Sequence, residues 1–185
     1  MRVLMIAPEP FFTPRGTPFS ILGRIQALVA LGHSVDLVTY HAGDDVVLPG
    51  LRIYRTPWIP WVRRVAIGPS LTKIFLDLML FNVALIRLTT GKYDVIHTHE
   101  EAGLMGTILA PLAKAQHLYD MHSSLPQQLA NFKAYNYAPI VRILDMLERV
   151  VICRADAVIT ICPELLERVT RIDGGRPCFL IENAI

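Results

Sequence analysis

The chain has 185 residues, of which 52% are hydrophobic, and its mean hydropathy is +0.40. The length predicts one domain spanning residues 1–185, and the hydrophobic excess indicates burial inside that domain and at an interface or a membrane surface. A formal net charge of only +2 excludes a general affinity for polyanions, so no nucleic-acid partner is expected. Three cysteines without a CxxC pair predict reduced thiols in a cytoplasmic protein, and neither a disulfide nor a metal site.

The hydrophobic pattern predicts neither an export signal nor a membrane span. The chain opens directly into an apolar strand pattern, so no cleavable signal peptide is expected. The most apolar stretch, residues 74–88, is interrupted by Asp77, Asn82 and Arg87, whereas a spanning helix needs about 20 apolar residues.

Short apolar runs alternate along the chain with segments of helical periodicity. Strands are expected at residues 2–7, 34–40, 51–55, 94–98, 116–120, 156–160 and 177–181. Helices are expected at residues 18–31, 70–89, 102–114, 127–154 and 163–171, with Ser70 as an N-cap and a break at Pro139. This alternation predicts an α/β fold with a doubly wound, mostly parallel, Rossmann-like sheet.

The first predicted strand leads into a Pro-rich loop, residues 8–18, in which Gly16 is the one glycine. The following helix aims its N-terminus at the carboxyl edge of the sheet, where backbone N–H groups and the helix dipole favour an anion such as phosphate. Gly16 would let the backbone approach a phosphate or a sugar closely, although a plain turn glycine fits the pattern equally well. No GxGxxG motif is present, which argues against a dinucleotide site, and the absence of GxxxxGK[ST] excludes a P-loop.

Polar residues follow the strand predicted at 94–98. His97 and His99 are two residues apart, and we expect them to point to opposite faces, so that at most one faces a given pocket and no metal pair forms. His99, Glu100 and Glu101 extend into the presumed cleft, where one of them could contact a hydroxyl-rich substrate. Capping of the next helix by Glu100 or Glu101 is the alternative.

His122 is the strongest single candidate for chemistry. It directly follows the strand predicted at 116–120 and is flanked by Asp120, Ser123 and Ser124. A histidine there could hydrogen-bond a sugar hydroxyl or stabilise developing charge, whereas an ordinary loop histidine is the alternative. A Ser-His-Asp triad is not supported, because the chain has no GxSxG motif.

Aromatic and basic residues precede the apolar helix predicted at 70–89, namely Trp58, Trp61, Arg63 and Arg64. Such residues beside an apolar helix suit a membrane–water interface. A buried helix behind an ordinary loop is the alternative, and the sequence leaves both readings open.

Six short strings in order make the whole chain resemble the N-terminal half of a GT-B glycosyltransferase, specifically the retaining GT4 group. They are Arg2–Ala7 with the Gly16 loop, Leu31–Val35 (like LGHEV), Tyr93–His99 (like DVIHxH), the histidine-bearing Asp120–Ser124, Ala155–Thr160 (like ADxVIxxS) and Ile181–Ile185 (like xPNGV). Each string is weak alone, and their common order carries the resemblance. The chain departs from the family in having one glycine before Thr17, Cys162 for a serine, and Glu182-Asn183-Ala184 for PNG.

The resemblance implies a role for each candidate residue. On the donor side, Gly16 and Thr17 would meet the donor through its diphosphate or sugar, and His122 would contact the donor sugar near the anomeric centre as the catalytic residue. The acceptor side would be formed by Glu9, Arg15, His99 and Glu100.

The resemblance also implies an activity, the transfer of a hexose from a nucleotide-diphosphate sugar to a hydroxyl acceptor such as a lipid-linked or cell-envelope glycan. The family's nucleotide-sugar site lies mostly in a C-terminal domain that this chain lacks, so we expect the chain to be inactive alone. No metal is implied, because the chain has no Asp-x-Asp motif, and no cofactor is implied beyond the nucleotide sugar as co-substrate. The alternatives are a non-catalytic subunit that binds an acceptor or a membrane and docks a separate donor-binding chain, or a protein like a sugar-nucleotide epimerase or a flavodoxin. We expect the protein in the cytoplasm, with the inner face of the membrane as its site of peripheral contact.

Overall fold

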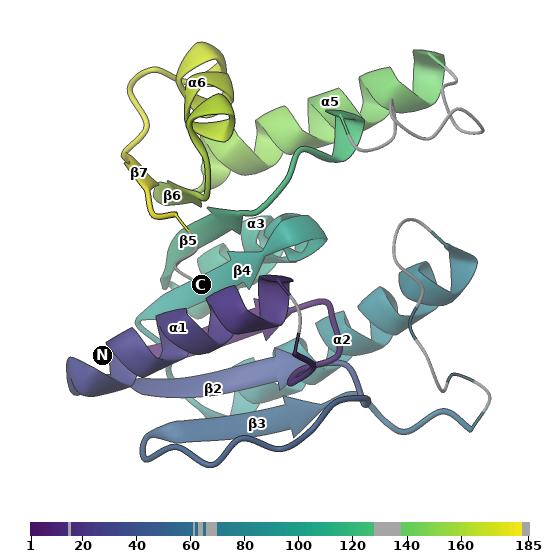
Figure 1. Ribbon diagram of the computed structural model, residues 1–185, viewed down its shortest axis with the longest axis vertical. Coiled ribbons are helices and arrows are strands. Elements are labelled where there is room, and N and C mark those ends of the chain that lie inside the picture. The colour runs from purple at the N-terminus through teal and green to yellow at the C-terminus, as the bar shows by residue number, and fades with distance from the viewer. Residues whose placement is uncertain (15, 61, 63–64, 66–69, 128–137, 183–185) are drawn as a thin grey trace.

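A computed structural model of the protein describes residues 1–14, 16–60, 62, 65, 70–127 and 138–182 (Figure 1). Within these residues a single sheet of parallel strands has the order β3-β2-β1-β4-β5-β6-β7. The strands are β1 (Arg2–Ala7), β2 (Ser34–Thr39), β3 (Leu51–Arg55), β4 (Val95–His99), β5 (Gln116–Met121), β6 (Ala157–Thr160) and β7 (Cys178–Leu180). The predicted doubly wound, parallel α/β sheet is therefore confirmed.

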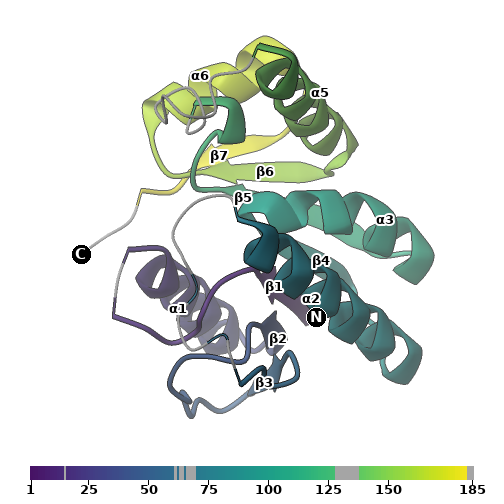
Figure 2. The same ribbon diagram turned by 90° about the vertical axis from the view of Figure 1, so that its right-hand side faces the viewer.

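Helices cover both faces of this sheet (Figure 2). They are α1 (Gly16–Ala30), α2 (Leu71–Thr90), α3 (Gly103–Ala113), which the 3₁₀ turn η1 (Glu100–Ala102) precedes, α5 (Ala138–Arg154) and α6 (Pro163–Ile172). Side chains of α1 pack against one face of β1 and β2, whereas side chains of α2 and α3 pack against the other. Buried residues of α5 and α6 form a third cluster with β5 and β6.

Helix boundaries differ from the predicted ones by a few residues, for local reasons. Helix α1 begins at Gly16, two residues early, because Pro18 in a first turn lacks only an N–H that has no helical partner there. The N-cap prediction is confirmed, since Oγ of Ser70 accepts a hydrogen bond from the backbone N of Lys73 at 3.1 Å. Helix α5 starts at Ala138, with Pro139 in its first turn, and residues 128–137 of the predicted helix lie outside the described residues.

Close packing of α3 on the sheet depends on its glycines. A Cβ placed on Gly106 would lie 2.1 Å from Nε2 of His117, and one on Gly103 would lie 2.8 Å from the Tyr119 ring. The His117 ring is itself held by a 2.8 Å hydrogen bond with the Thr98 hydroxyl. The two glycines thus let α3 lie close to β4 and β5, and this sets where η1 meets the sheet edge.

The order of the strands reverses between β1 and β4. The chain proceeds from β1 outward to β2 and β3, then crosses over to β4 and continues to β7 in the opposite direction. Ligands of open α/β sheets bind beyond the carboxyl ends of the strands at such a point. The loop after β1, the turn η1 after β4 and residues 122–124 after β5 all lie at that edge.

Candidate functional site

The loop after β1 is fixed to its neighbours by its own backbone carbonyl groups. The Glu9 carbonyl accepts hydrogen bonds from the Thr39 hydroxyl at 2.5 Å and from the backbone N of Tyr40 at 3.3 Å. The guanidinium of Arg55 donates to the carbonyl of Phe11 at 2.6 Å and also to the carbonyls of Tyr40, Ala42 and Asp44. The loop that carries Glu9 is therefore held in one place at the sheet edge.

Gly43 lets the β2–β3 connection approach this loop closely. Its φ of +112° is one that L side chains rarely adopt, and an added Cβ would lie 2.4 Å from the Phe11 carbonyl group. Phe12 and Asp44 then exchange two backbone hydrogen bonds of 2.9 Å each. Sequence reasoning missed both Arg55 and Gly43, although a glycine between two predicted strands was a visible signal.

Gly16 and Thr17 form the first turn of α1 at the carboxyl end of β1. Gly16 is exposed, and an added Cβ would meet nothing within 4 Å, so there is open space in front of this turn. Its φ is not positive, so the backbone conformation alone does not require glycine. The free N–H groups of the first turn suit an anion. Arg15 lies outside the described residues.

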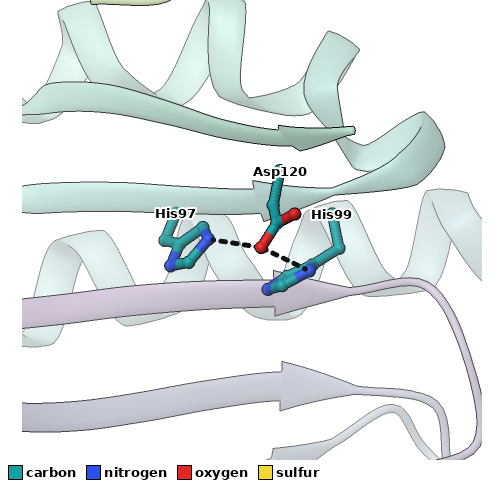
Figure 3. A group of neighbouring side chains, drawn as sticks. All are labelled: His97, His99 and Asp120. Atoms are coloured by element: carbon teal, nitrogen blue, oxygen red, sulfur yellow. Dashed lines mark ion pairs between the residues drawn. The ribbon is translucent and has the colours of Figure 1, made fainter. Parts of the chain in front are cut away.

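His97 and His99 point to the same face of the sheet, and the prediction that they point to opposite faces is wrong. Side chains alternate along a strand, so residues two apart share a face. The two rings stack with centroids 4.6 Å apart, and both are turned toward the carboxylate of Asp120 on β5 (Figure 3). Nε2 of His97 lies 3.5 Å and Nδ1 of His99 lies 3.8 Å from Oδ2 of Asp120.

His122 completes this cluster from the turn after β5. Its Nε2 lies 3.0 Å from Nδ1 of His99, within hydrogen-bond distance, and 3.3 Å from Oδ1 of Asp120. The ring is buried, and its Nδ1 has no hydrogen-bond partner among the described residues. Two of the predicted site residues, His99 and His122, are thus brought together, and His97 joins them because it lies on the same face of β4 as His99.

Arg24 supplies the positive charge of the cluster from helix α1. Its Nε donates to Oδ2 of Asp120 at 3.1 Å, and its Nη2 donates to the carbonyl of Ile181 at 3.1 Å. Sequence reasoning missed Arg24, and the signal for it was a lone arginine among the apolar residues of that helix. The side chain of Asp120 is fully buried, and Arg24 gives its carboxylate a charged hydrogen-bond partner there.

Burial and mutual contact set the protonation of the cluster. Burial lowers the pKa of His99 well below its usual value, and the neighbouring charge of His97 lowers it further. Burial also lowers the pKa of His122, with Arg24 and His97 acting in the same direction and Asp120 opposing them. For Asp120, burial raises the pKa, but contact with His97 and the charges of His99 and His122 outweigh it and leave the pKa below the usual range. Near neutral pH, these pKa directions leave the imidazoles of His99 and His122 neutral and the carboxylate of Asp120 ionised.

Glu100 and Glu101 make side-chain contacts across the sheet edge, so the capping alternative does not describe them. Oε2 of Glu100 accepts a hydrogen bond from the hydroxyl of Ser123 at 2.6 Å, and Glu101 forms an ion pair with Lys73 of α2. Neither η1 nor the helix α3 that follows it has a side-chain cap hydrogen bond. Burial raises the pKa of Glu100 to about 7, against the opposing hydrogen bond from Ser123.

Helix α2 brings a second carboxyl group with a raised pKa, that of Asp77, to this edge. The hydroxyl of Tyr40, at the end of β2, donates a hydrogen bond to Oδ1 of Asp77. Burial raises the pKa of Asp77 to about 7, although the Tyr40 hydrogen bond lowers it. The sequence showed Asp77 only as an interruption of an apolar stretch, and it gave no sign that this side chain reaches the edge.

The outward side of α2 exposes large apolar side chains, namely Leu71, Ile74, Phe75, Leu78, Leu85 and Ile86. Trp58 is 70% exposed, whereas Trp61, Arg63 and Arg64 lie outside the described residues. Among the helices of the described part, none is long and apolar enough to cross a membrane. Helix α2 therefore buries one side, with Leu76, Leu80 and Ala84, and exposes the other.

Comparison with protein families finds a family model that matches this chain. The family model of the glycosyl transferase 4-like domain matches residues 16–183, which is most of the chain. A search of curated proteins found no match.

Solved structures share the fold at low sequence identity. Sucrose-phosphate synthase from Thermosynechococcus elongatus superposes with a TM-score of 0.75 at 20% identity, covering 100% of this chain and 48% of that one. A UGT transferase from Siraitia grosvenorii in complex with UDP has a TM-score of 0.63 at 9% identity, covering 98% and 51%. A UDP-glucosyltransferase from Polygonum tinctorium has a TM-score of 0.60 at 8% identity, covering 100% and 52%. This chain thus spans about half the length of these proteins.

Proposed function

Because the chain belongs to the glycosyl transferase 4-like family, we propose that it is the acceptor-side domain of a retaining GT-B glycosyltransferase. The complete enzyme moves a hexose from a nucleotide-diphosphate sugar to a hydroxyl acceptor. The observation that carries the proposal is the meeting of His122, His99 and Glu100 at the carboxyl edge beside the first turn of α1. The family match favours a transferase over a sugar-nucleotide epimerase or a flavodoxin-like protein.

On the donor side, Gly16 and Thr17 offer backbone N–H groups to the diphosphate or the sugar. The open space in front of Gly16 and the dipole of the 15-residue helix α1 support this role. His122 acts as the catalytic residue by hydrogen-bonding a hydroxyl of the donor sugar close to the anomeric centre. Its Nε2 is engaged by His99 and Asp120, which leaves Nδ1 as the ring atom for the sugar.

On the acceptor side, Glu9, Arg15, His99 and Glu100 contact the hydroxyl groups of the incoming substrate. The first loop carries Glu9 and Arg15, and β4 with η1 carries the other two residues. Glu100 is suited to accept a proton from an acceptor hydroxyl, because a carboxylate whose pKa lies near 7 can both bind and release a proton at neutral pH. The acceptor itself is a lipid-linked or cell-envelope glycan.

The proposal makes the chain one of two domains. The solved structures that share its fold are about twice as long, and UDP is bound in one of them. The missing domain supplies most of the nucleotide-sugar site, so the 185 residues alone do not transfer sugar. The reaction needs no cofactor besides the nucleotide sugar, and the domain binds no nucleic acid.

The experiment is a transfer assay on the domain joined to its donor-binding partner. We expect His122→Ala to lower kcat by about 10²–10³-fold, as removal of one charge-stabilising donor does in other enzymes. His33→Ala, at the opposite end of β2, is the matched control and keeps the rate. Equal rates for both variants would contradict the assignment of His122.

A second function, peripheral contact with the inner face of the membrane, is supported by the exposed apolar side of α2 and by the exposure of Trp58 earlier in the chain. Trp61, Arg63 and Arg64 join this contact in the proposal, since aromatic and basic residues suit an anionic membrane surface. Such a domain could act without catalysis, as a membrane- or acceptor-binding subunit that docks a separate donor-binding chain. Co-sedimentation with anionic vesicles tests this: binding that is lost in the double variant Trp58→Ala/Trp61→Ala supports it, and no binding by the unaltered chain removes it.

A further inference from the structure

The polar cluster at the ends of β4 and β5 leaves several buried nitrogen atoms without partners. Both ring nitrogens of His97, Nε2 of His99 and Nδ1 of His122 have no hydrogen-bond partner among the described residues, and neither does Oδ1 of Asp120. The four side chains are between 92% and 100% buried. A buried polar atom without a partner costs roughly 1–3 kcal/mol. Two of these atoms, Nε2 of His97 and Oδ1 of Asp120, lie at the contacts inside the cluster and point to a ligand that binds between the side chains.

We propose that His97, His99, His122 and Asp120 form a binding site for a divalent transition-metal ion of the zinc class. Three imidazoles and one carboxylate are ligands that this class prefers. His97, His99 and Asp120 already hold one ligand atom each within 4.8 Å of one another. His122 adds a fourth from the turn after β5.

The distances between ligand atoms lie within about 0.3 Å of those around a tetrahedral ion. The rings of His97 and His99 are stacked with an interplanar angle of 23°, so they must turn about their side-chain bonds before both can aim a nitrogen at one ion. Bonds of about 2.0–2.2 Å place the ligand atoms of a tetrahedral zinc ion roughly 3.3–3.5 Å apart. The printed separations are 3.5 Å for His97 with Asp120, 3.8 Å for His99 with Asp120, 3.3 Å for His122 with Asp120 and 3.0 Å for His99 with His122. The ion would replace the proton that His99 and His122 share.

Arg24 is the group that weakens this site. Its guanidinium lies 3.1 Å from Oδ2 of Asp120 and already balances that charge. The ion would contact both carboxylate oxygens: Oδ2 faces His97 and His99 and still accepts from Arg24, whereas Oδ1, which has no hydrogen bond, faces His122. Repulsion between Arg24 and the ion lowers the affinity of the site, so we expect the ion to exchange more readily than the ion of a structural zinc site.

Metal binding itself does not depend on the proposed function; only its expected effect, inhibition of the transferase, rests on that function. An ion held by His99 and His122 occupies the residues that the transfer reaction uses, so metal inhibits the transferase. The site is formed by this chain alone, so metal binding is measured without any transfer assay, and failure of one proposal leaves the other intact.

The experiment is titration of the purified 185-residue chain with Co²⁺ or Zn²⁺ as the only added ligand. We expect one ion per chain and a Co²⁺ absorption spectrum of four-coordinate type. His97→Gln and His99→Gln should each weaken binding at least tenfold, since loss of even an outer partner costs about 10–100-fold. The control His33→Gln, near the N-terminal amine, should bind as the unaltered chain does.

Two further measurements keep the proposal testable if a histidine variant fails to fold. Arg24→Gln removes the competing positive charge and should tighten Zn²⁺ binding, an effect that a purely structural role of Arg24 would not produce. In the unaltered chain, Zn²⁺ should shift the ring ¹⁵N signals of His97, His99 and His122 and leave those of His117 in place. No binding of either ion, binding that His33→Gln abolishes, or weaker binding in Arg24→Gln would overturn the proposal.

Discussion

The contact between Arg24 and Asp120 joins a guanidinium to a fully buried carboxylate, and a double-mutant cycle measures its strength. At 3.1 Å and an effective dielectric constant of about 20, the Coulomb attraction is roughly 5 kcal/mol, an upper bound before desolvation is subtracted. Arg24→Gln leaves a fully buried carboxylate, so we expect it to cost about 3–5 kcal/mol. Asp120→Asn leaves a guanidinium that is 14% exposed and still donates to Ile181, so its cost should be smaller, about 1–3 kcal/mol.

The double variant separates the energy of the Arg24–Asp120 contact from the cost of burying either side chain without its partner. Because Arg24→Gln and Asp120→Asn remove the same contact, the double variant should cost less than the sum of the single ones, with a coupling energy of about 1–3 kcal/mol. The assay is equilibrium unfolding in urea with a chelator present, and a constant m-value checks that unfolding stays two-state. A coupling energy below about 0.5 kcal/mol would show that Arg24 and Asp120 do not depend on each other.

Three further predictions concern the elements that shape the site. Gly106→Ala should destabilise the chain by about 2–4 kcal/mol through the clash with the His117 ring. The control Gly23→Ala, exposed on α1 with open space around it, should stabilise the chain by about 0.5–1 kcal/mol. Similar free energies of unfolding in urea for the two variants would contradict the close packing of α3. Burial raises the pKa of Asp77 to about 7, so the folded state holds this proton more tightly than the unfolded one, and stability should fall as the pH rises from about 4 to about 7, by at most about 4 kcal/mol. In Asp77→Asn that fall should be smaller, and an unchanged pH profile would argue against the buried acid. Arg55→Lys removes donors from the carbonyls that fix the first loop, so amide exchange of Phe12 should accelerate while exchange in β6 does not, and uniform acceleration would indicate global destabilisation instead.

The strands and their order in the chain could be predicted, because strands buried in a parallel sheet are continuous apolar runs that end in polar residues. The run from Arg2 to Ala7 and the run before His122 needed no tertiary information. Predicted and observed strand ends differ by at most one residue, and for β4 that shift matters, since it puts His99 inside the strand.

The composition of the polar cluster could not be predicted in full, for two different reasons. The two-residue period of a strand places His97 and His99 on the same face, so this contact was available from the sequence. The prediction failed because it assigned residues two apart to opposite faces. Arg24 and Asp77 meet the sheet edge only because their helices dock at particular positions along β1 and β2, and helix periodicity does not specify that docking. Sequence pattern therefore located the edge, and tertiary packing decided which charges meet there.

The most direct test of the proposed function is the release of nucleoside diphosphate from a panel of nucleotide sugars. It compares the domain joined to its donor-binding partner, the same protein with His122→Ala, and the 185-residue chain alone. We predict sugar-dependent release by the joined protein, a loss of about 10²–10³-fold in the variant and no turnover by the chain alone. Turnover by the isolated chain, or full activity of the variant, would contradict the account.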